Sequence, residues 1–430
     1  MSNDFDAIVI GAGFAGITAA RELTAKGRRT LLLEARDRIG GRVYTERFAG
    51  QTIELGGAWV HWTQPHVWAE MTRYGIGTVP DVDPEIAIFP QPDGYRAFPA
   101  EEAFARQHEL LTRLFADADE YFPYPHEPLR ATERLARADK LSLHDAIKNL
   151  DLSPEDEGLL TGLASGESGG RAARGALTMT GHWWALGNLE HIGFHEIFTH
   201  RLENGMIKLA EAMLADASAE LRLNTAVASV EDDGTTVRVT TRDGQVFTAA
   251  SAVVAVPVNV WKNIDFRPGL PQEFTDASTE GIGVPNAVKL ALHIRGDFGP
   301  VYAQSEEGAP MVGLFAHRVL DDGQLVVGFI VEDDVDPDDF QQVEAAVKLL
   351  EPRAELVDYT YHDWGRDEFS QGGWAYRQPG QLSQLLGPIQ QPQGRLAFAN
   401  GDMSKGWSGC VDGAIETGLT AARHVNSVIG

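Results

Sequence analysis

The sequence predicts a two-domain α/β protein that opens with a Rossmann-like unit, and three observations predict it. An apolar strand at residues 6–10 is followed at once by the glycine pattern G-x-G-x-x-G and by a helix that runs to about residue 26. A second strand at residues 30–33 then ends in an acidic residue. The chain is 430 residues long, which is more than a single hydrophobic core usually holds.

Each glycine of this turn serves a structural purpose. Gly11 permits the tight turn, Gly13 lets the backbone approach a pyrophosphate, and Gly16 allows the helix to pack closely on the strand. The helix N-terminus then presents free N–H groups and the positive end of its dipole to the phosphates. Glu34, at the end of the second strand, is placed to accept hydrogen bonds from the adenosine ribose. The segment therefore predicts a dinucleotide site.

A basic turn follows directly and narrows the choice of dinucleotide. It reads R-D-R-I-G-G-R, in which Arg36 and Arg42 carry planar guanidinium groups suited to phosphate, and Gly41 stands beside Arg42. A solvated basic turn is the alternative. Together with the first turn, the segment resembles the FAD-binding start of the flavin-dependent amine oxidases, a family that includes monoamine oxidases, polyamine oxidases and bacterial nicotine and 6-hydroxynicotine oxidases. Phytoene desaturases and protoporphyrinogen oxidases share this start, so it indicates FAD more strongly than it indicates an amine.

Composition and charge exclude several classes of partner. Hydrophobic residues make up 43% and charged residues 23% of the chain, which is ordinary, but the net charge is −26 at pH 7. Such an acidic chain is unsuited to nucleic acid or to an anionic membrane. Its single cysteine excludes an intramolecular disulfide and a cysteine-rich metal site. We expect a cytoplasmic enzyme with no signal peptide, no membrane segment and no metal, and leave a homodimer open.

The pattern along the chain predicts two discontinuous domains. Residues 1–80, 201–284 and 391–430 are assigned to the FAD-binding domain, and residues 81–200 and 285–390 to an α+β substrate-binding domain. Apolar spacing and turn residues mark the expected elements. Helices are expected at 103–115, 143–150 and 207–215, and extended segments at 221–224, 227–231, 236–241, 245–250, 251–256 and 394–400.

The resemblance implies further flavin contacts in the first domain. The segment E-L-G-G-A-W-V-H at 54–61 follows a short strand, and its small residues let the backbone approach a flat ring. By their place in the family's pattern, Gly57, Ala58 and Trp59 contact the flavin, and Val227 gives backbone contacts to the adenine. The run G-G-A-W-V-H followed by W-T-Q-P-H-V-W is most similar to the bacterial nicotine-oxidising members.

A second motif lies near the C-terminus. After a strand expected to end at Asn400, the chain reads G-D-M-S-K-G-W-S-G-C-V-D-G-A, which is similar to the family's C-terminal pattern. The resemblance implies that Asp402 binds a ribityl or phosphate-side hydroxyl, and that Trp407 and Val411 also contact the cofactor. The helix that follows can stabilise negative charge on the reduced flavin with its N-terminus. Both ends of the chain therefore predict FAD.

Three residues are candidates for the chemistry. Lys289 lies in the apolar strand N-A-V-K-L-A-L, where the family places a lysine that holds a water at flavin N5; a solvent-facing lysine on an edge strand is the alternative. Trp374, in a strand expected at G-G-W-A-Y, corresponds to one aromatic wall of the substrate site, with core packing as the alternative. Cys410 stands where the second wall is often a tyrosine.

The resemblance implies FAD-dependent oxidation of an amine. Hydride transfer to flavin N5 gives an imine that water hydrolyses to an aldehyde or ketone, and O2 or another acceptor reoxidises the flavin, O2 giving H2O2. Because Cys410 interrupts the aromatic pair, the amine stays open: a nicotine-like cyclic amine, a methylaminoalkyl chain, a bulky secondary amine and a simple primary amine all remain. The alternatives are a C–C desaturase or protoporphyrinogen-type oxidase, and a non-catalytic flavin-binding redox module.

We expect FAD to be bound without a covalent link. The covalent members of the family carry a cysteine at or near the position of Trp374, and this chain has none there. Acid precipitation should therefore leave the yellow colour in the supernatant. Colour that stays in the protein pellet would show a covalent bond and contradict the prediction.

Overall fold

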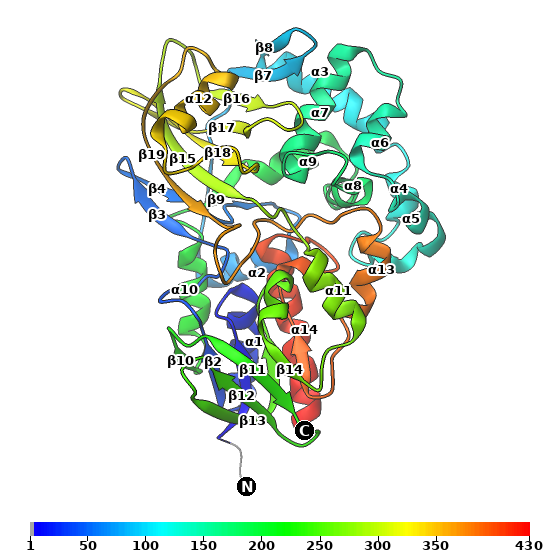
Figure 1. Ribbon diagram of the computed structural model, residues 1–430, viewed down its shortest axis with the longest axis vertical. Coiled ribbons are helices and arrows are strands. Elements are labelled where there is room, and N and C mark those ends of the chain that lie inside the picture. The colour runs from blue at the N-terminus through cyan, green and yellow to red at the C-terminus, as the bar shows by residue number, and fades with distance from the viewer. Residues whose placement is uncertain (1–3) are drawn as a thin grey trace.

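The computed structural model describes residues 4–430, and its two halves are built on two different sheets (Figure 1). The half at the bottom of Figure 1 holds an eight-stranded sheet with α1 (Phe14–Thr24), α10 (Ile207–Ala215) and α14 (Val411–Ile429). The half at the top holds a seven-stranded sheet with a group of helices beside it. The predicted mixed α/β class, with a Rossmann-like unit and a second α+β unit, is confirmed.

The eight-stranded sheet contains the strands of the predicted dinucleotide unit. β1 (Phe5–Ile10) lies between β2 (Thr30–Leu33) and β13 (Val246–Val254), parallel to both. Their nearly continuous apolar sequences suit strands that are covered on both faces. The path is β10-β2-β1-β13-β12-β11-β14, with β20 beside β13; the other strands are β10 (Glu220–Arg222), β11 (Val227–Asp232), β12 (Val237–Thr241), β14 (Asp265–Arg267) and β20 (Leu396–Phe398).

Strand β13 is longer than the sequence pattern suggested. Extended segments were expected at 245–250 and at 251–256, but the structure has one strand, Val246–Val254. Its first half pairs antiparallel with β12, and its second half pairs parallel with β1 and β20. The stretch Val246–Val254 contains no glycine or proline, so the strand continues where its pairing changes from β12 to β1 and β20.

Helices α1 and α14 cross closely on one face of this sheet. Gly418 of α14 faces α1 so directly that a Cβ on it would lie 2.4 Å from the carbonyl oxygen of Ala15. The side chains of Ile17, Leu23 and Val425 are fully buried in the core that these helices share with the sheet. The crossing places the N-termini of both helices at the same end of the sheet, near the carboxyl ends of the parallel strands.

The seven-stranded sheet is almost entirely antiparallel. Its order is β19-β15-β18-β17-β16-β7-β8, and only β16 and β7 run parallel. Strands β15 and β18 lie inside it, so their side chains are largely buried. The strands are β7 (Ile86–Gln91), β8 (Gly94–Pro99), β15 (Val288–Arg295), β16 (Val301–Gln304), β17 (Met311–Leu320), β18 (Gly323–Ile330) and β19 (Glu355–Asp363), with α12 (Phe340–Leu350) against β17 and β19.

Most of the helices in the top half of Figure 1 come from one stretch of chain. The helices expected at 103–115 and 143–150 are present as α3 and α6, and Ser142 caps α6 by accepting the N–H of Asp145. The stretch contains α3 (Ala100–Leu114), α4 (Ala118–Tyr121), η1 (Pro128–Arg130), α5 (Thr132–Ala138), α6 (Leu143–Lys148), α7 (Pro154–Ser168), α8 (Leu177–Leu186), α9 (His191–His195) and η2 (Glu196–Phe198).

Shorter elements connect the two halves. β5, β9 and β6 form a small sheet that joins segments more than 100 residues apart, and α13 packs with α11 in the core of the eight-stranded sheet although it falls in the range expected for the substrate-binding domain. The domain boundaries stay a prediction. The connecting elements are β3 (Thr45–Phe48), β4 (Gln51–Glu54), β5 (Trp59–Val60), α2 (Pro65–Tyr74), β6 (Thr78–Pro80), β9 (His200–Leu202), η3 (Val258–Asn263), α11 (Gln272–Glu280), α13 (Gln381–Ile389) and η4 (Gly401–Met403).

Two features are absent from residues 4–430. None of their helices combines the length and the apolar character that crossing a membrane requires. In the same residues, no three His, Cys, Asp or Glu side chains are grouped so that they could hold a metal ion.

Candidate active site

A cavity of about 360 Å³ is lined by residues from both halves of the protein and from both ends of the sequence. Three of the predicted site residues, Gly16, Asp402 and Trp407, lie behind its wall. The predicted residues that line it are Gly11, Gly13, Glu34, Arg36, Gly41, Arg42, Gly57, Ala58, Trp59, Val227, Lys289, Trp374, Cys410 and Val411.

The glycine turn has the geometry that a dinucleotide needs. Gly11 has φ +102°, a conformation that residues with a side chain rarely adopt. A Cβ on Gly16 would lie 1.9 Å from the carbonyl oxygen of Gly11, so only glycine lets α1 start this close to the turn. Gly41 of the basic turn also lies against the first turn, because a Cβ on it would lie 3.2 Å from Cα of Gly13. The two turns form a continuous backbone cradle.

Two helix N-termini reach this cavity without a side-chain cap. α1 begins after Gly13 and α14 begins after Cys410, and neither residue accepts a hydrogen bond from its helix through a side chain. Phe14 and Ala15 of α1, and Val411 of α14, line the cavity. Uncapped N–H groups and the positive end of a helix dipole bind negative charge. The cavity therefore offers two separate places where a diphosphate or an anionic ring is stabilised.

Glu34 and Arg36 are held by neighbouring residues. The Glu34 carboxylate accepts the N–H of Ala12 at 2.8 Å and the N–H of Arg36 at 2.9 Å, which closes the glycine turn. A carboxylate has about four acceptor positions, so hydrogen bonds from a ribose remain available. The Arg36 guanidinium donates to Asp367 and, at 3.0 Å, to the hydroxyl of Ser370. Contacts of Glu34 with ribose and of Arg36 with phosphate stay predictions.

Arg42 joins three segments that are distant in sequence. Its guanidinium donates to Asp402 at 2.5 Å and to the carbonyl oxygen of Gly373 at 3.1 Å. Asp402 also accepts the N–H of Val258 at 3.1 Å and is completely buried. The side chain of Asp402 is thus occupied inside the protein, which differs from the direct cofactor hydrogen bond expected from the sequence. It positions Arg42, which does line the cavity.

Trp407 also supports the site from behind. Its ring is fully buried 5.3 Å from the ring of His61, and its indole N–H donates to the carbonyl oxygen of Thr63. This position differs from the cofactor contact expected for Trp407. The indole fixes the turn that carries Ser408 and Cys410, and a second indole, from Trp183, donates to the carbonyl oxygen of Ser408 at 3.1 Å.

Lys289 is buried in the inner strand β15, so the solvent-facing alternative is wrong. Its ammonium donates to the carbonyl oxygen of Gly56 at 2.8 Å and lies 4.6 Å from the centre of the Trp59 ring and 5.5 Å from that of Phe329. Burial lowers the pKa of Lys289, and the nearby negative charge of Glu54 opposes that shift. The side chain holds a cation against the cavity wall, next to the segment predicted to contact flavin.

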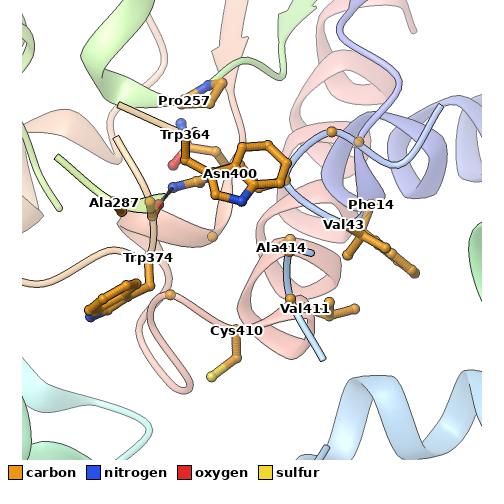
Figure 2. Close-up of a pocket in the computed structure, with 18 of the residues that line it drawn as sticks. Phe14, Val43, Pro257, Ala287, Trp364, Trp374, Asn400, Cys410, Val411 and Ala414 are labelled. Carbon is orange, nitrogen blue, oxygen red and sulfur yellow. Dashed lines mark hydrogen bonds between the residues drawn. The ribbon is translucent and has the colours of Figure 1, made fainter. Parts of the chain in front are cut away.

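Trp374 and Cys410 lie on two loops at one side of the pocket (Figure 2). The loops touch, because a Cβ on Gly409 would meet the carbonyl oxygen of Ala375 at 3.0 Å. The strand expected around Trp374 is absent: Gly372 has φ +150°, and only two backbone hydrogen bonds tie this segment to Val284. Burial raises the pKa of the Cys410 thiol to about 12, so this wall is small and uncharged.

Glu167 is one of several polar cavity residues that the sequence did not point to, and it is the one joined to Trp374. It lies at the end of α7, and its carboxylate accepts the hydroxyl of Thr180 at 2.9 Å. The backbone carbonyl of Glu167 accepts the indole N–H of Trp374 at 2.8 Å. Burial without a cation raises the pKa of Glu167 to about 8. One signal was available: Leu160, Leu163 and Glu167 follow the spacing of one helix face, and an acidic residue on an apolar face is unusual.

These features fit FAD. The close contacts at Gly11, Gly16 and Gly41 show turns packed so tightly that only glycine fits. Gly11, Gly13 and Gly41 line the cavity beside the N-terminus of α1, an arrangement that suits a diphosphate. The small residues Gly57 and Ala58 line the same cavity further along. The α14 N-terminus then lies beside Cys410, at the end of the cavity that holds the substrate walls.

Comparison with known proteins agrees with this geometry. Residues 14–426 match the family described as flavin containing amine oxidoreductase. The chain belongs to this family. It is 38% identical to the nicotine dehydrogenase of Pseudomonas putida, covering 99% of this chain and 89% of that protein. It is 32% identical to the (S)-6-hydroxynicotine oxidase of Paenarthrobacter nicotinovorans, covering 98% of this chain and 99% of that protein.

A solved structure shows the same fold. The structure of putrescine oxidase bound to putrescine superimposes with a TM-score of 0.81 at 19% identity, covering 98% of this chain and 99% of that chain. The predictions of a flavin-dependent amine oxidase, of FAD as cofactor and of an enzyme that acts on small amines are confirmed. The roles of the individual site residues stay predictions.

The Arg42–Asp402 pair predicts a strong effect of Asp402→Asn. The exchange leaves the Arg42 guanidinium without its counter-charge, and removing one partner of a buried ion pair costs about 3–5 kcal/mol. Because Arg42 keeps 23% of its side chain exposed, we expect the low end of that range, with faster loss of FAD on dilution. Urea unfolding and flavin fluorescence measure the two effects. Glu355→Gln, which removes an exposed ion pair with Arg295, is the control, and equal behaviour of the two variants would contradict the prediction.

Proposed function

We propose that this enzyme oxidises the C–N bond of a bulky, ring-bearing secondary or tertiary amine, with non-covalent FAD and with O2 as electron acceptor. The observation that supports it most directly is the continuity of one cavity. The dinucleotide cradle at Gly13 and the chamber lined by Lys289, Trp374 and Cys410 belong to the same space. Cofactor and substrate can therefore meet without any rearrangement of the chain.

The walls of the chamber support a bulky substrate. Trp374 offers a large flat surface, held by its hydrogen bond to α7. Cys410, on the neighbouring loop, is a short side chain, which leaves room that a tyrosine would occupy. The aromatic side chains of Tyr302, Phe315 and Phe329 line the same cavity and extend the apolar surface. Two of the chain's relatives are named for nicotine and 6-hydroxynicotine, which are ring-bearing amines.

Glu167 supports a substrate with a positive charge or a second basic nitrogen. A buried carboxyl with a single hydroxyl partner gains most from a cation, because ion pairing offsets the cost of burying its charge. Glu167 is joined to Trp374 through its own backbone, so the charged and aromatic parts of the chamber are fixed relative to one another. A substrate held by both has one bound orientation.

The remaining residues have complementary tasks. When bound, FAD accepts hydride from the carbon beside the amine nitrogen and passes the electrons to the acceptor. Lys289 holds a proton at Nζ beside the predicted flavin segment, and the α14 N-terminus stabilises negative charge there. The apolar lining excludes water from the reacting atoms. The single cysteine, placed inside the chamber, supports a cytoplasmic location.

The proposal predicts anaerobic bleaching of the flavin by ring-bearing secondary or tertiary amines, with recovery of the colour and formation of peroxide when air is admitted.

Cys410→Tyr should narrow the chamber and lower kcat/KM for a ring-bearing amine relative to a small primary amine by about tenfold or more. Cys410→Ser, which preserves the size of the side chain, is the control.

Stopped-flow absorbance with both amines gives the preference ratio, and FAD content is measured in parallel. Absence of bleaching with every amine would contradict the proposed function. An unchanged preference ratio in Cys410→Tyr would instead show that the proposed function holds without Cys410 as a wall.

Glu167 predicts a pH dependence for the binding of a permanent cation. Its pKa of about 8 means that the carboxyl is neutral below that pH in the free site. An N-methylpyridinium inhibitor should therefore bind more tightly as pH rises, by at most tenfold per unit, and reach a plateau above about 8. In Glu167→Gln the affinity should be flat with pH and lower at the plateau by about 10- to 100-fold. Inhibition constants for this cation and for a neutral compound of the same shape test it; a pH slope of unchanged size in Glu167→Gln would exclude Glu167 as the cation-binding group.

A further inference from the structure

Lys289 stands between two cavities. One is the active-site cavity, and the other is a separate small cavity of about 10 Å³; Ala58, Trp59 and Lys289 line both. The only hydrogen bond of the ammonium among the described residues is the one to Gly56, and an ammonium has three N–H groups. The side chain can therefore donate toward each cavity.

The small cavity is lined mainly by apolar side chains, but three charged or titratable residues besides Lys289 reach it. Glu54, Arg201 and His317 reach it, together with the apolar side chains of β18. Its volume is about that of one water molecule. The Nη2 of Arg201 is buried and has no hydrogen-bond partner within residues 4–430, so a donor is available there. Glu54 is also buried, and accepts hydrogen bonds from the hydroxyl of Thr45 and the N–H of Met206.

Asp81 connects this cavity with solvent. It accepts hydrogen bonds from Arg201 at 2.6 Å, from the indole of Trp59 at 2.7 Å and from His317 at 3.0 Å. These four residues are called the Asp81 cluster below. The side chain of Asp81 keeps 12% of its surface exposed, whereas that of Arg201 keeps 8%. The cluster thus begins at the protein surface and ends at the small cavity beside Lys289.

We propose that Glu54 and the Asp81 cluster form a proton path that connects the ammonium of Lys289 to solvent. In one direction, Lys289 releases a proton into the active site and becomes a neutral amine. The Glu54 carboxyl then gives its proton to that amine, and the resulting carboxylate regains one from solvent through the cavity and the Asp81 cluster. The proton count balances at each step, and Arg201 stays protonated throughout. The inference rests on the proposed function only in placing the reaction on the Lys289 side of the cavity.

An amine oxidase needs such a path, because each turnover releases and takes up protons inside the active-site cavity. An ammonium substrate loses a proton before its C–N bond is oxidised, and reduction of O2 to H2O2 takes up two protons with two electrons. The lining of the active-site cavity near Lys289 is mostly aromatic, with Trp59 and Phe329 on either side. The small cavity, which Lys289 also lines, brings the titratable side chains of Glu54 and His317 to this lysine.

The electrostatics of these groups suit proton exchange. Burial lowers the pKa of Lys289 and raises that of Glu54, so the proton affinities of the two groups approach each other. Asp81 and Arg201 also act on Lys289, with opposite signs. The other charged or titratable groups that face these residues are His317, whose pKa is lowered by burial, Arg318 beside it, and His362, which is paired across the sheet with Lys289 and bound to Asp367.

The test compares Glu54→Gln with the FAD-bound wild type. Enzyme labelled with 13C-lysine is titrated by NMR, and the Lys289 signal is assigned by its loss in Lys289→Met. Without the carboxylate, the pKa of Lys289 should fall by about one unit or more. Glu351→Gln, which alters an equally buried carboxylate held by Arg353 at the end of α12, should leave that pKa unchanged.

A kinetic measurement completes the test. In stopped-flow, reduced Glu54→Gln enzyme should be reoxidised by O2 about 10- to 100-fold more slowly than wild type, with a larger slowing in D2O. Addition of formate, a weak acid small enough for the space vacated in Glu54→Gly, should restore part of the rate. An unchanged pKa of Lys289 in Glu54→Gln would overturn the path, as would an unchanged reoxidation rate and isotope effect. The NMR result does not require an amine substrate, so its failure and that of the proposed function are distinguishable.

Discussion

The ion pair between Arg42 and Asp402 is the contact on which the site depends. It joins the basic turn after β2 to the C-terminal motif, 360 residues away in the chain, and Arg42 adds the loop of Trp374 through Gly373. Asp402 in turn holds the start of η3 through Val258. Both charges are largely withdrawn from water, so each needs the other. The cofactor cradle and the substrate wall are therefore positioned by one guanidinium.

Other buried charges in the site are also balanced by neighbouring groups. Lys289, Glu54 and Asp81 are charged groups placed among apolar strands, and each is offset by carbonyl, aromatic or opposite charges. Glu167 is the exception, since a hydroxyl is the only hydrogen-bond partner of its carboxylate within residues 4–430. The protein is acidic, and its other buried charges compensate one another, whereas one carboxyl in the cavity has no counter-charge. A cation is therefore attracted to that carboxyl. This arrangement agrees with a family that oxidises amines.

What the sequence could predict depended on how local the determinant is. The glycine turn at Gly11, the burial of Lys289 and the helix after Val411 are visible in short stretches, because backbone geometry and apolar spacing act over a few residues. Asp402 and Trp407 were placed on the correct segment, but their side chains turn inward to partners that only the tertiary fold supplies. Glu167 was missed because its partners, Thr180 and Trp374, come from other elements. The strand expected at Trp374 was wrong for the same reason: its glycines serve contacts with Val284 and Asn259 and do not continue a sheet.

The hydrogen bond that fixes Trp374 uses the backbone carbonyl of Glu167 and not its carboxylate. Every amino acid has that carbonyl, so exchange of the side chain at position 167 leaves the anchoring of the indole in place. Substitutions at position 167 can thus change the charge and polarity of the chamber while the Trp374 indole keeps its place. In a laboratory selection for activity on new amines, the side chain at position 167 can be varied in charge, polarity and volume while the aromatic wall formed by Trp374 stays constant. Changes at Trp374 itself alter shape and anchoring together, and so combine poorly with other substitutions.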